Sequence, residues 1–330
     1  MANNEIAAVF KGPQFGVETT AGTGVAANKK LNSFGLTISP QGEGEAYAPV
    51  GAKLNSLQIP PGMRWCTAAI NGRLAYSQAP YLLSACLKDA TPSTPSGGTN
   101  TRLWVYDLAQ SSADAIKTYT VEVGDSTRAQ KFNYGFINEL QIEMSKRQAV
   151  VTGSMMGREL QDDVTITSSP TLVANTPVFP HNFIVSFADT QAGLAAATPL
   201  SLPFKASFKV GNRFNMVEAM DGTTSFADIV EVKPSVELSL TLAANDAGYG
   251  PLSKLTGGSA QFIRIKNDGS TIEGSLKYLF QIDFCGACVK FPSQAEQDGA
   301  LTVEWNFMAL YDSTWGKAFE VRVQNVLASL

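Results

Sequence analysis

Residues 232–244 read VKPSVELSLTLAA, and this stretch decides how the rest of the chain is interpreted. Its apolar residues Val236, Leu238, Leu240 and Leu242 alternate with Glu, Ser and Thr. Alternation with a period of two places successive side chains on opposite faces of an extended strand. One face is then buried, and the other meets water or a partner. The stretch therefore predicts a half-buried β-strand that follows a proline.

The same two-residue period recurs along the chain, whereas helical spacing is rare. It is clearest in residues 118–123, 140–145, 303–309 and 319–323. The best helix candidate is 75–87, with a weaker one at 248–255, and long irregular segments separate the strands. The chain is therefore predicted to be mainly β, with short flanking α-helices and long inter-strand loops.

Composition points to a protein whose surface is covered by neighbouring subunits. The chain has 330 residues, of which 44% are apolar and 16% charged, against about 25% charged in a typical soluble domain.

The net charge is −4 with scattered Lys and Arg, so tight nucleic-acid binding is not expected, although a mildly acidic surface suits DNA that must pass without sticking. No apolar run is long enough to cross a bilayer, and the protein is expected to be made and kept in a cytoplasm.

An internal repeat predicts two tandem domains. Residues 59–71, IPPGMRWCTAAIN, match 232–244 in outline when Pro61 is placed on Pro234. Each copy then has a strand that follows a proline, a polar turn and a short helical segment. A proline-rich stretch between the copies is typical of a linker. The predicted division is 1–165 for the first domain, 166–180 for the linker and 181–330 for the second domain.

Catalytic and metal-binding patterns are weak. His181 is the only histidine, and no nucleophile motif accompanies it. Cys285 and Cys288 have the spacing of half a zinc site, but residues three apart on a strand point to opposite faces, and no second pair lies nearby. Asp162 and Asp163 are expected to be solvated. We therefore predict no enzyme activity, no metal site and no cofactor.

Two further segments are FKGPQFGVETTAGT, residues 10–23, and AVVTGSMMGREL, residues 149–160. These segments resemble the major tail tube proteins of siphophages, which have noncontractile tails. The resemblance implies a β-sandwich or barrel whose inner sheet joins those of its neighbours into stacked rings around a DNA channel. Because the chain is predicted to carry two copies of the fold, the resemblance implies trimers with pseudo-sixfold symmetry. It further implies a place in the virion tail, assembly with itself, and tape measure, terminator and distal tail proteins as partners.

Other members of the same fold group remain alternatives at this stage. One is a distal tail or tail-tip adaptor, and another is the inner tube subunit of a contractile tail or secretion system. An adaptor would stop at one ring, whereas a tube subunit would polymerise.

The resemblance also assigns candidate residues to two surfaces. Apolar residues in the two long loops are candidates for contacts between rings, unless the loops fold back on their own domain: Tyr47, Phe214, Met216, Met220 and Phe226. Polar residues on the alternating strands are candidates for the channel wall, although an outer wall would expose them equally: Gln141, Glu143, Glu237 and Glu304.

Overall fold

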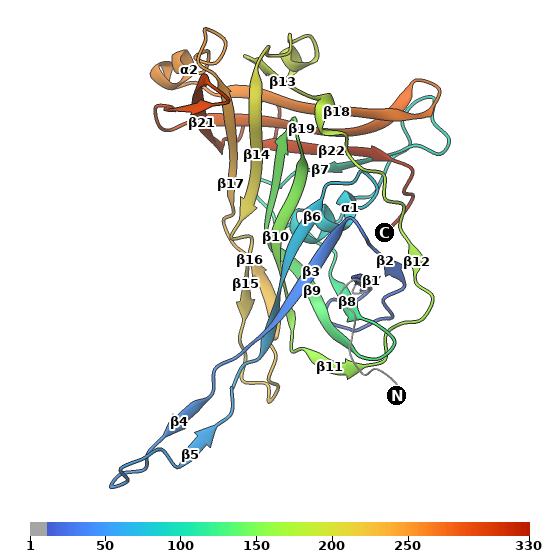
Figure 1. Cartoon of the computed structure of the whole chain (residues 1–330), viewed down its shortest axis with the longest axis vertical. Coiled ribbons are helices and arrows are strands. Elements are labelled where there is room, and N and C mark those ends of the chain that lie inside the picture. Colours follow the sequence, from blue (N-terminus) through green and yellow to red (C-terminus); the bar gives the residue numbers. More distant parts are fainter. Residues whose placement is uncertain (1–11) are drawn as a thin grey trace.

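The computed structural model describes residues 12–330, and these are predominantly β-strand, as the alternation predicted. Phe10 and Lys11 of the opening motif lie outside the described residues. The chain forms an elongated body with a long hairpin that projects from one end (Figure 1).

The first half supplies twelve strands and one helix. Their bounds are β1 Gln14–Val17, β2 Lys29–Lys30, β3 Phe34–Gln41, β4 Glu45–Tyr47, β5 Leu57–Ile59, β6 Trp65–Arg73, α1 Ala79–Cys86, β7 Arg102–Tyr106, β8 Tyr119–Gly124, β9 Ala129–Ser145, β10 Ala149–Arg158, β11 Gln161–Val164 and β12 Thr171–Leu172.

The second half supplies ten strands, one α-helix and two 3₁₀ turns. Their bounds are η2 Pro180–Asn182, β13 Phe183–Ala188, η3 Ala192–Ala195, β14 Pro203–Gly211, β15 Phe214–Val217, β16 Asp228–Glu231, β17 Ser235–Ala243, α2 Leu252–Gly257, β18 Gln261–Glu273, β19 Leu276–Cys288, β20 Ser293–Gln297, β21 Ala300–Ala309 and β22 Phe319–Asn325.

Eight antiparallel strands form a central sheet that runs through both halves. Their order is β3–β6–β10–β9–β14–β17–β21–β20. The step from β9 to β14 joins the first half to the second, with Leu140 opposite Val210 and Ser145 opposite Lys205. The central sheet therefore continues from the first half of the chain into the second.

Two outer sheets complete the body. One has the order β12–β2–β1–β8–β9–β11, and the other β13–β18–β19–β22–β7. The long strands β9 and β19 each pair in an outer sheet through their first part and in the central sheet through their last part. Apolar residues of these sheets and of α1 form one core that includes Phe15, Tyr81, Phe208 and Trp305.

The two halves repeat the same strand register. In the first half Gln41 lies opposite Trp65, and in the second Gly211 lies opposite Ser235. Adding 170 to the residue numbers of the β3–β6 ladder therefore gives the β14–β17 ladder. Placing Pro61 on Pro234 corresponds to a shift of 173 residues, three more than the shift of 170 between the two ladders. The sequence alignment matched the prolines before the strands rather than the paired residues.

The halves also interlock. Strand β7 of the first half pairs with β22 at the end of the second. The Tyr76 hydroxyl donates to the Asn267 Oδ1 at 2.5 Å, and the Asn325 side chain donates to the Tyr76 carbonyl at 2.8 Å. Within the stretch predicted as a linker, β12 runs parallel to β2. The connection between the halves is thus attached to the body.

Helix α1 lies within the predicted range 75–87, and α2 overlaps the second half of the predicted range 248–255 and ends two residues beyond it. All eight residues of α1 are buried, and Pro80 occupies its first turn, where the missing N–H costs no helical bond. Helix α2 is capped by Gly258, the residue after its end, whose φ of 64° suits a glycine C-cap. Neither helix in residues 12–330 is long and apolar enough to cross a membrane.

Candidate functional site: a polar sheet face, two free edges and an arm

The four residues predicted for the channel wall lie together on one face of the central sheet. Gln141, Glu143, Glu237 and Glu304 come from β9, β17 and β21. They line one shallow depression together with Lys205, Ser207, Lys209, Ser239, Thr241 and Asn306. The alternation predicted which residues share a face, and the strand order decided that those faces are adjacent.

The charges on this face are partly neutralised by its own lysines. The Lys205 ammonium lies 3.3 Å from the Glu143 carboxylate, and Lys209 lies 2.5 Å from Glu139. The hydrogen bond from Lys209 to Glu139 raises the pKa of that lysine. Glu304 accepts a hydrogen bond from Ser239 at 3.2 Å and has no ion pair within residues 12–330. The face is therefore mildly acidic and polar rather than strongly charged.

The central sheet ends in two unpaired edges. Among the described residues, β3 pairs only with β6, and β20 pairs only with β21. All five residues of β20 are exposed, as are Gly35, Thr37 and Ser39 on β3. An open edge of this kind presents unpaired N–H and C=O groups to another chain. Sequence alternation could not identify these edges, because it carries no information on strand order.

The hairpin β4–β5 forms an arm that extends away from the body (Figure 1). Its apolar side chains are exposed, with Val50 and Leu54 near the tip and Leu57 and Ile59 on β5. Tyr47, predicted for a contact between rings, lies on β4 and is 39% exposed. The arm has no core of its own, so its apolar surface is available for another molecule.

The equivalent hairpin of the second half, β15–β16, folds back on the chain. Phe214 and Phe226, which were also predicted for contacts between rings, are 5% and 1% exposed. They pack with Tyr134 and Phe136 of β9. For these two residues the expectation of an available contact surface is wrong, because the first half supplies an aromatic pocket that no local pattern encodes.

The other two residues of this loop differ from each other. Met216 is half-buried against the same aromatic cluster, whereas Met220 at the tip is fully exposed. Of the five predicted loop residues, Tyr47 and Met220 therefore present apolar surface to solvent.

Arg158 of the first half binds the β15–β16 hairpin through hydrogen bonds. Its guanidinium donates to the carbonyls of Phe226 at 3.2 Å and Ala227 at 2.8 Å. The same group lies 4.9 Å from the centre of the Tyr134 ring, a distance typical of a cation–π contact. Arg158, which lies in the segment 149–160, thus has a structural role.

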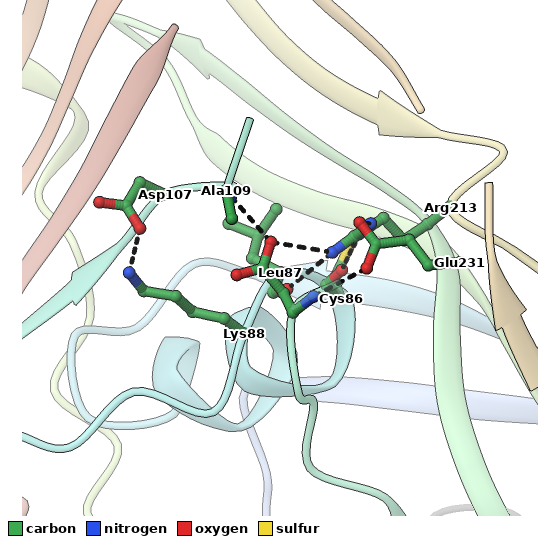
Figure 2. A network of polar contacts seen from close by, with 8 residues as sticks. Cys86, Leu87, Lys88, Asp107, Ala109, Arg213 and Glu231 are labelled. Carbon is green, nitrogen blue, oxygen red and sulfur yellow. Dashed lines mark hydrogen bonds and ion pairs between the residues drawn. The ribbon is translucent and has the colours of Figure 1, made fainter. Parts of the chain in front are cut away.

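Arg213, just before β15, forms a second anchor at the end of α1 (Figure 2). It is fully buried and donates to the carbonyls of Cys86 and Leu87, each at 3.2 Å. It also forms an ion pair with Glu231 and lies 3.5 Å from the Asp114 carboxylate. A cation at a helix C-terminus is favourable, because the last carbonyls lack partners and carry partial negative charge.

The cysteines and the histidine belong to no metal-binding cluster in the part of the chain that the structure describes. No cluster of His, Cys, Asp or Glu within residues 12–330 has the arrangement of a metal site. Burial raises the pKa of both Cys285 and Cys288 to about 11, so these thiols are neutral near pH 7. Asp162 pairs with Arg128 on the surface.

These features define a β-rich protein whose notable surfaces are strand edges, a polar sheet face and an apolar arm. A family profile described as phage tail tube protein matches residues 14–310. The chain therefore belongs to the phage tail tube protein family and is a structural subunit of a phage tail tube. No curated protein sequence matches it.

Proposed function

We propose that three copies of this chain close into a ring with pseudo-sixfold symmetry, and that the rings stack into the tube of a noncontractile tail. The observation that carries this proposal is the junction between β9 and β14. There, two equivalent four-stranded units join edge to edge within one chain. The unpaired edges of β3 and β20 are complementary in position to that junction, so each copy can continue the sheet into the next.

The repeated register supports a tandem duplication. Both halves have the same order of outer strand, inner strand, hairpin, inner strand and helix, followed by further strands. The ladders β3–β6 and β14–β17 coincide after a shift of 170 residues. A closed ring of such chains removes every free edge of the central sheet, and the fusion provides half of the junctions at high effective concentration.

The size of the closed sheet favours three copies. Strands about 4.8 Å apart and tilted by about 40° give 24 strands a backbone diameter of about 48 Å. Allowing about 10 Å in total for side chains leaves a channel of about 38 Å. Two copies would leave about 22 Å by the same estimate, which a DNA duplex would nearly fill. The polar face with Gln141, Glu143, Glu237 and Glu304 would then form the wall.

A mildly acidic wall suits the passage of DNA during ejection. Phosphates bind protein mainly through Lys and Arg, and release of their counterions drives that binding. Lys205 and Lys209 are already paired with carboxylates on this face, so they offer DNA little free positive charge. DNA would therefore slide along this wall rather than bind to it.

The β4–β5 arm is proposed to reach the next ring along the tube axis. The apolar side chains of Val50 and Leu54 are removed from water only if another molecule covers them. In the virion tail, the ends of the tube would meet terminator and distal tail proteins, and the channel would hold the tape measure protein during assembly, as in similar tails.

Cryo-electron microscopy of the purified chain tests this function. Hollow tubes with three chains per ring are expected. Six whole chains per ring would refute the pseudo-sixfold arrangement, and single rings that never stack would favour an adaptor over a tube subunit.

A further inference from the structure

The proposed ring leaves open which residues of adjacent copies face each other. The ladder between β9 and β14, called the internal junction, gives a model for that contact. Between β9 and β14, Gln141 lies opposite Lys209, Glu143 opposite Ser207 and Ser145 opposite Lys205. Both partners of this junction have an equivalent at the free edges. The residue numbers of those equivalents follow from the ladders inside each half.

The equivalent of β14 is β3. Adding 170 converts the β3–β6 ladder into the β14–β17 ladder, so Thr37 corresponds to Ser207 and Ser39 to Lys209. These residues occupy the same position relative to the neighbouring inner strand. The free edge of β3 is thus the counterpart of the β14 edge that β9 covers.

The equivalent of the last part of β9 is β20. In the first half Thr152 lies opposite Gln141 and Val150 opposite Glu143. In the second half Glu304 lies opposite Ser293 and Thr302 opposite Ala295. Adding 152 to the first ladder gives the second, so Ser293 corresponds to Gln141 and Ala295 to Glu143.

We infer that β20 pairs with β3 of the next copy in the register of the internal junction, with Ser293 opposite Ser39, Ala295 opposite Thr37 and Gln297 opposite Gly35. This inference rests on the proposed ring, and the partner is a second copy of this chain. The ladder covers residues 293–297 and 35–39.

The ends of the free strands agree with this register. Pro40 and Pro292 fall opposite each other at one end of the ladder, where neither supplies a backbone N–H. Proline at that position ends the pairing without leaving a donor unpaired. Just before Pro292, Phe291 is 72% exposed, and the next copy would cover it at the margin of the junction.

The two kinds of junction would differ chemically. At the internal junction the polar face carries the pairs Glu143–Lys205 and Glu139–Lys209. At the junction between copies, Ala295, Gly35 and Ser39 take the places of Glu143, Lys205 and Lys209. Backbone hydrogen bonds and small neutral side chains would therefore hold the copies together on this face, and salt would screen this contact little.

Disulfide cross-linking tests the register with four exposed positions in matched and mismatched combinations, in a Cys288→Ser background. The matched variants combine Thr37→Cys with Ala295→Cys, and Ser39→Cys with Ser293→Cys. The mismatched controls exchange the partners, so that each pair lies two residues out of register. Directly opposed residues have Cα atoms about 4.5–5.5 Å apart, within reach of a disulfide, whereas diagonal neighbours are about 7–8 Å apart.

Tubes would be assembled under reducing conditions, oxidised and run on denaturing gels without reductant. Both matched variants are expected to give covalent dimers and trimers, and the mismatched controls to remain single chains. A cross-link must join two copies, because β3 and β20 are the opposite margins of one sheet.

The outcomes separate the register from the function. Cross-links in a mismatched control, or none in any variant although tubes form, would overturn the inferred register and leave the tube function standing. Failure of the unmodified chain to form rings or tubes would overturn the proposed function itself and the register with it.

Discussion

Replacing Arg213 by methionine should loosen the β15–β16 hairpin from the body. Arg213 is fully buried and holds the Cys86 and Leu87 carbonyls, the Glu231 carboxylate and, at 3.5 Å, Asp114. Methionine fills a similar volume, so the core stays occupied, but every polar partner loses its contact with the guanidinium. The change therefore isolates the charge and the hydrogen bonds from packing.

The expected cost is about 3–5 kcal/mol, because removal of one member of a buried ion pair leaves the other charge uncompensated. The side chains of Asp114 and Glu231 are only 11% and 20% exposed, so water replaces the lost cation poorly. If the chain unfolds as one unit, the unfolding entropy of 330 residues converts this cost into a fall of about 4–7 °C in Tm.

Differential scanning fluorimetry measures the change in Tm, and limited proteolysis within residues 218–227 reports release of the hairpin. Lys209→Met is the matched control, because its ion pair with Glu139 is about half exposed and contributes at most about 1 kcal/mol. Adding Glu231→Gln to Arg213→Met should recover part of the loss. The reasoning is refuted if Arg213→Met unfolds within 1 °C of the Lys209→Met control and the hairpin stays protected.

Three further predictions concern the arm, the wall and the response to acid. Val50→Asp together with Leu54→Asp should leave Tm unchanged, because both side chains are exposed. Negative-stain images of this double variant should show single rings in place of tubes. Normal tubes would mean that the arm takes no part in stacking. Glu237→Lys together with Glu304→Lys should slow DNA ejection from assembled virions by adding unpaired positive charge to the wall, and an unchanged ejection rate would place these residues elsewhere. Glu273 accepts hydrogen bonds from the Thr101 hydroxyl and from the backbone N–H groups of residues 99–101, which lower its pKa from 4.5 to about 2. Since the folded-state pKa is depressed, its contribution to stability is present above pH 4.5 and is lost as pH falls toward 2. The difference in Tm between the unmodified chain and Glu273→Gln should therefore shrink between pH 6 and pH 2.5, and a constant difference would contradict this.

Alternation alone determined which residues of each strand share a face. Leu238 and Leu240 are fully buried, whereas Glu237 is exposed and Ser239 is half-buried on the opposite, polar face. This follows because a strand has a side-chain period of two whatever it pairs with. The predicted strand content and the polar face of each separate strand have this local origin.

Tertiary structure decided which strands are neighbours and which loops project. The hairpins 45–59 and 214–231 occupy equivalent places in the two halves, yet one projects and the other folds back. The difference comes from Tyr134, Phe136 and Arg158, which are far from the second hairpin in sequence and pack against it or donate hydrogen bonds to it. Long-range contacts of this kind set the strand order and the free edges, and a pattern read along the chain does not contain them.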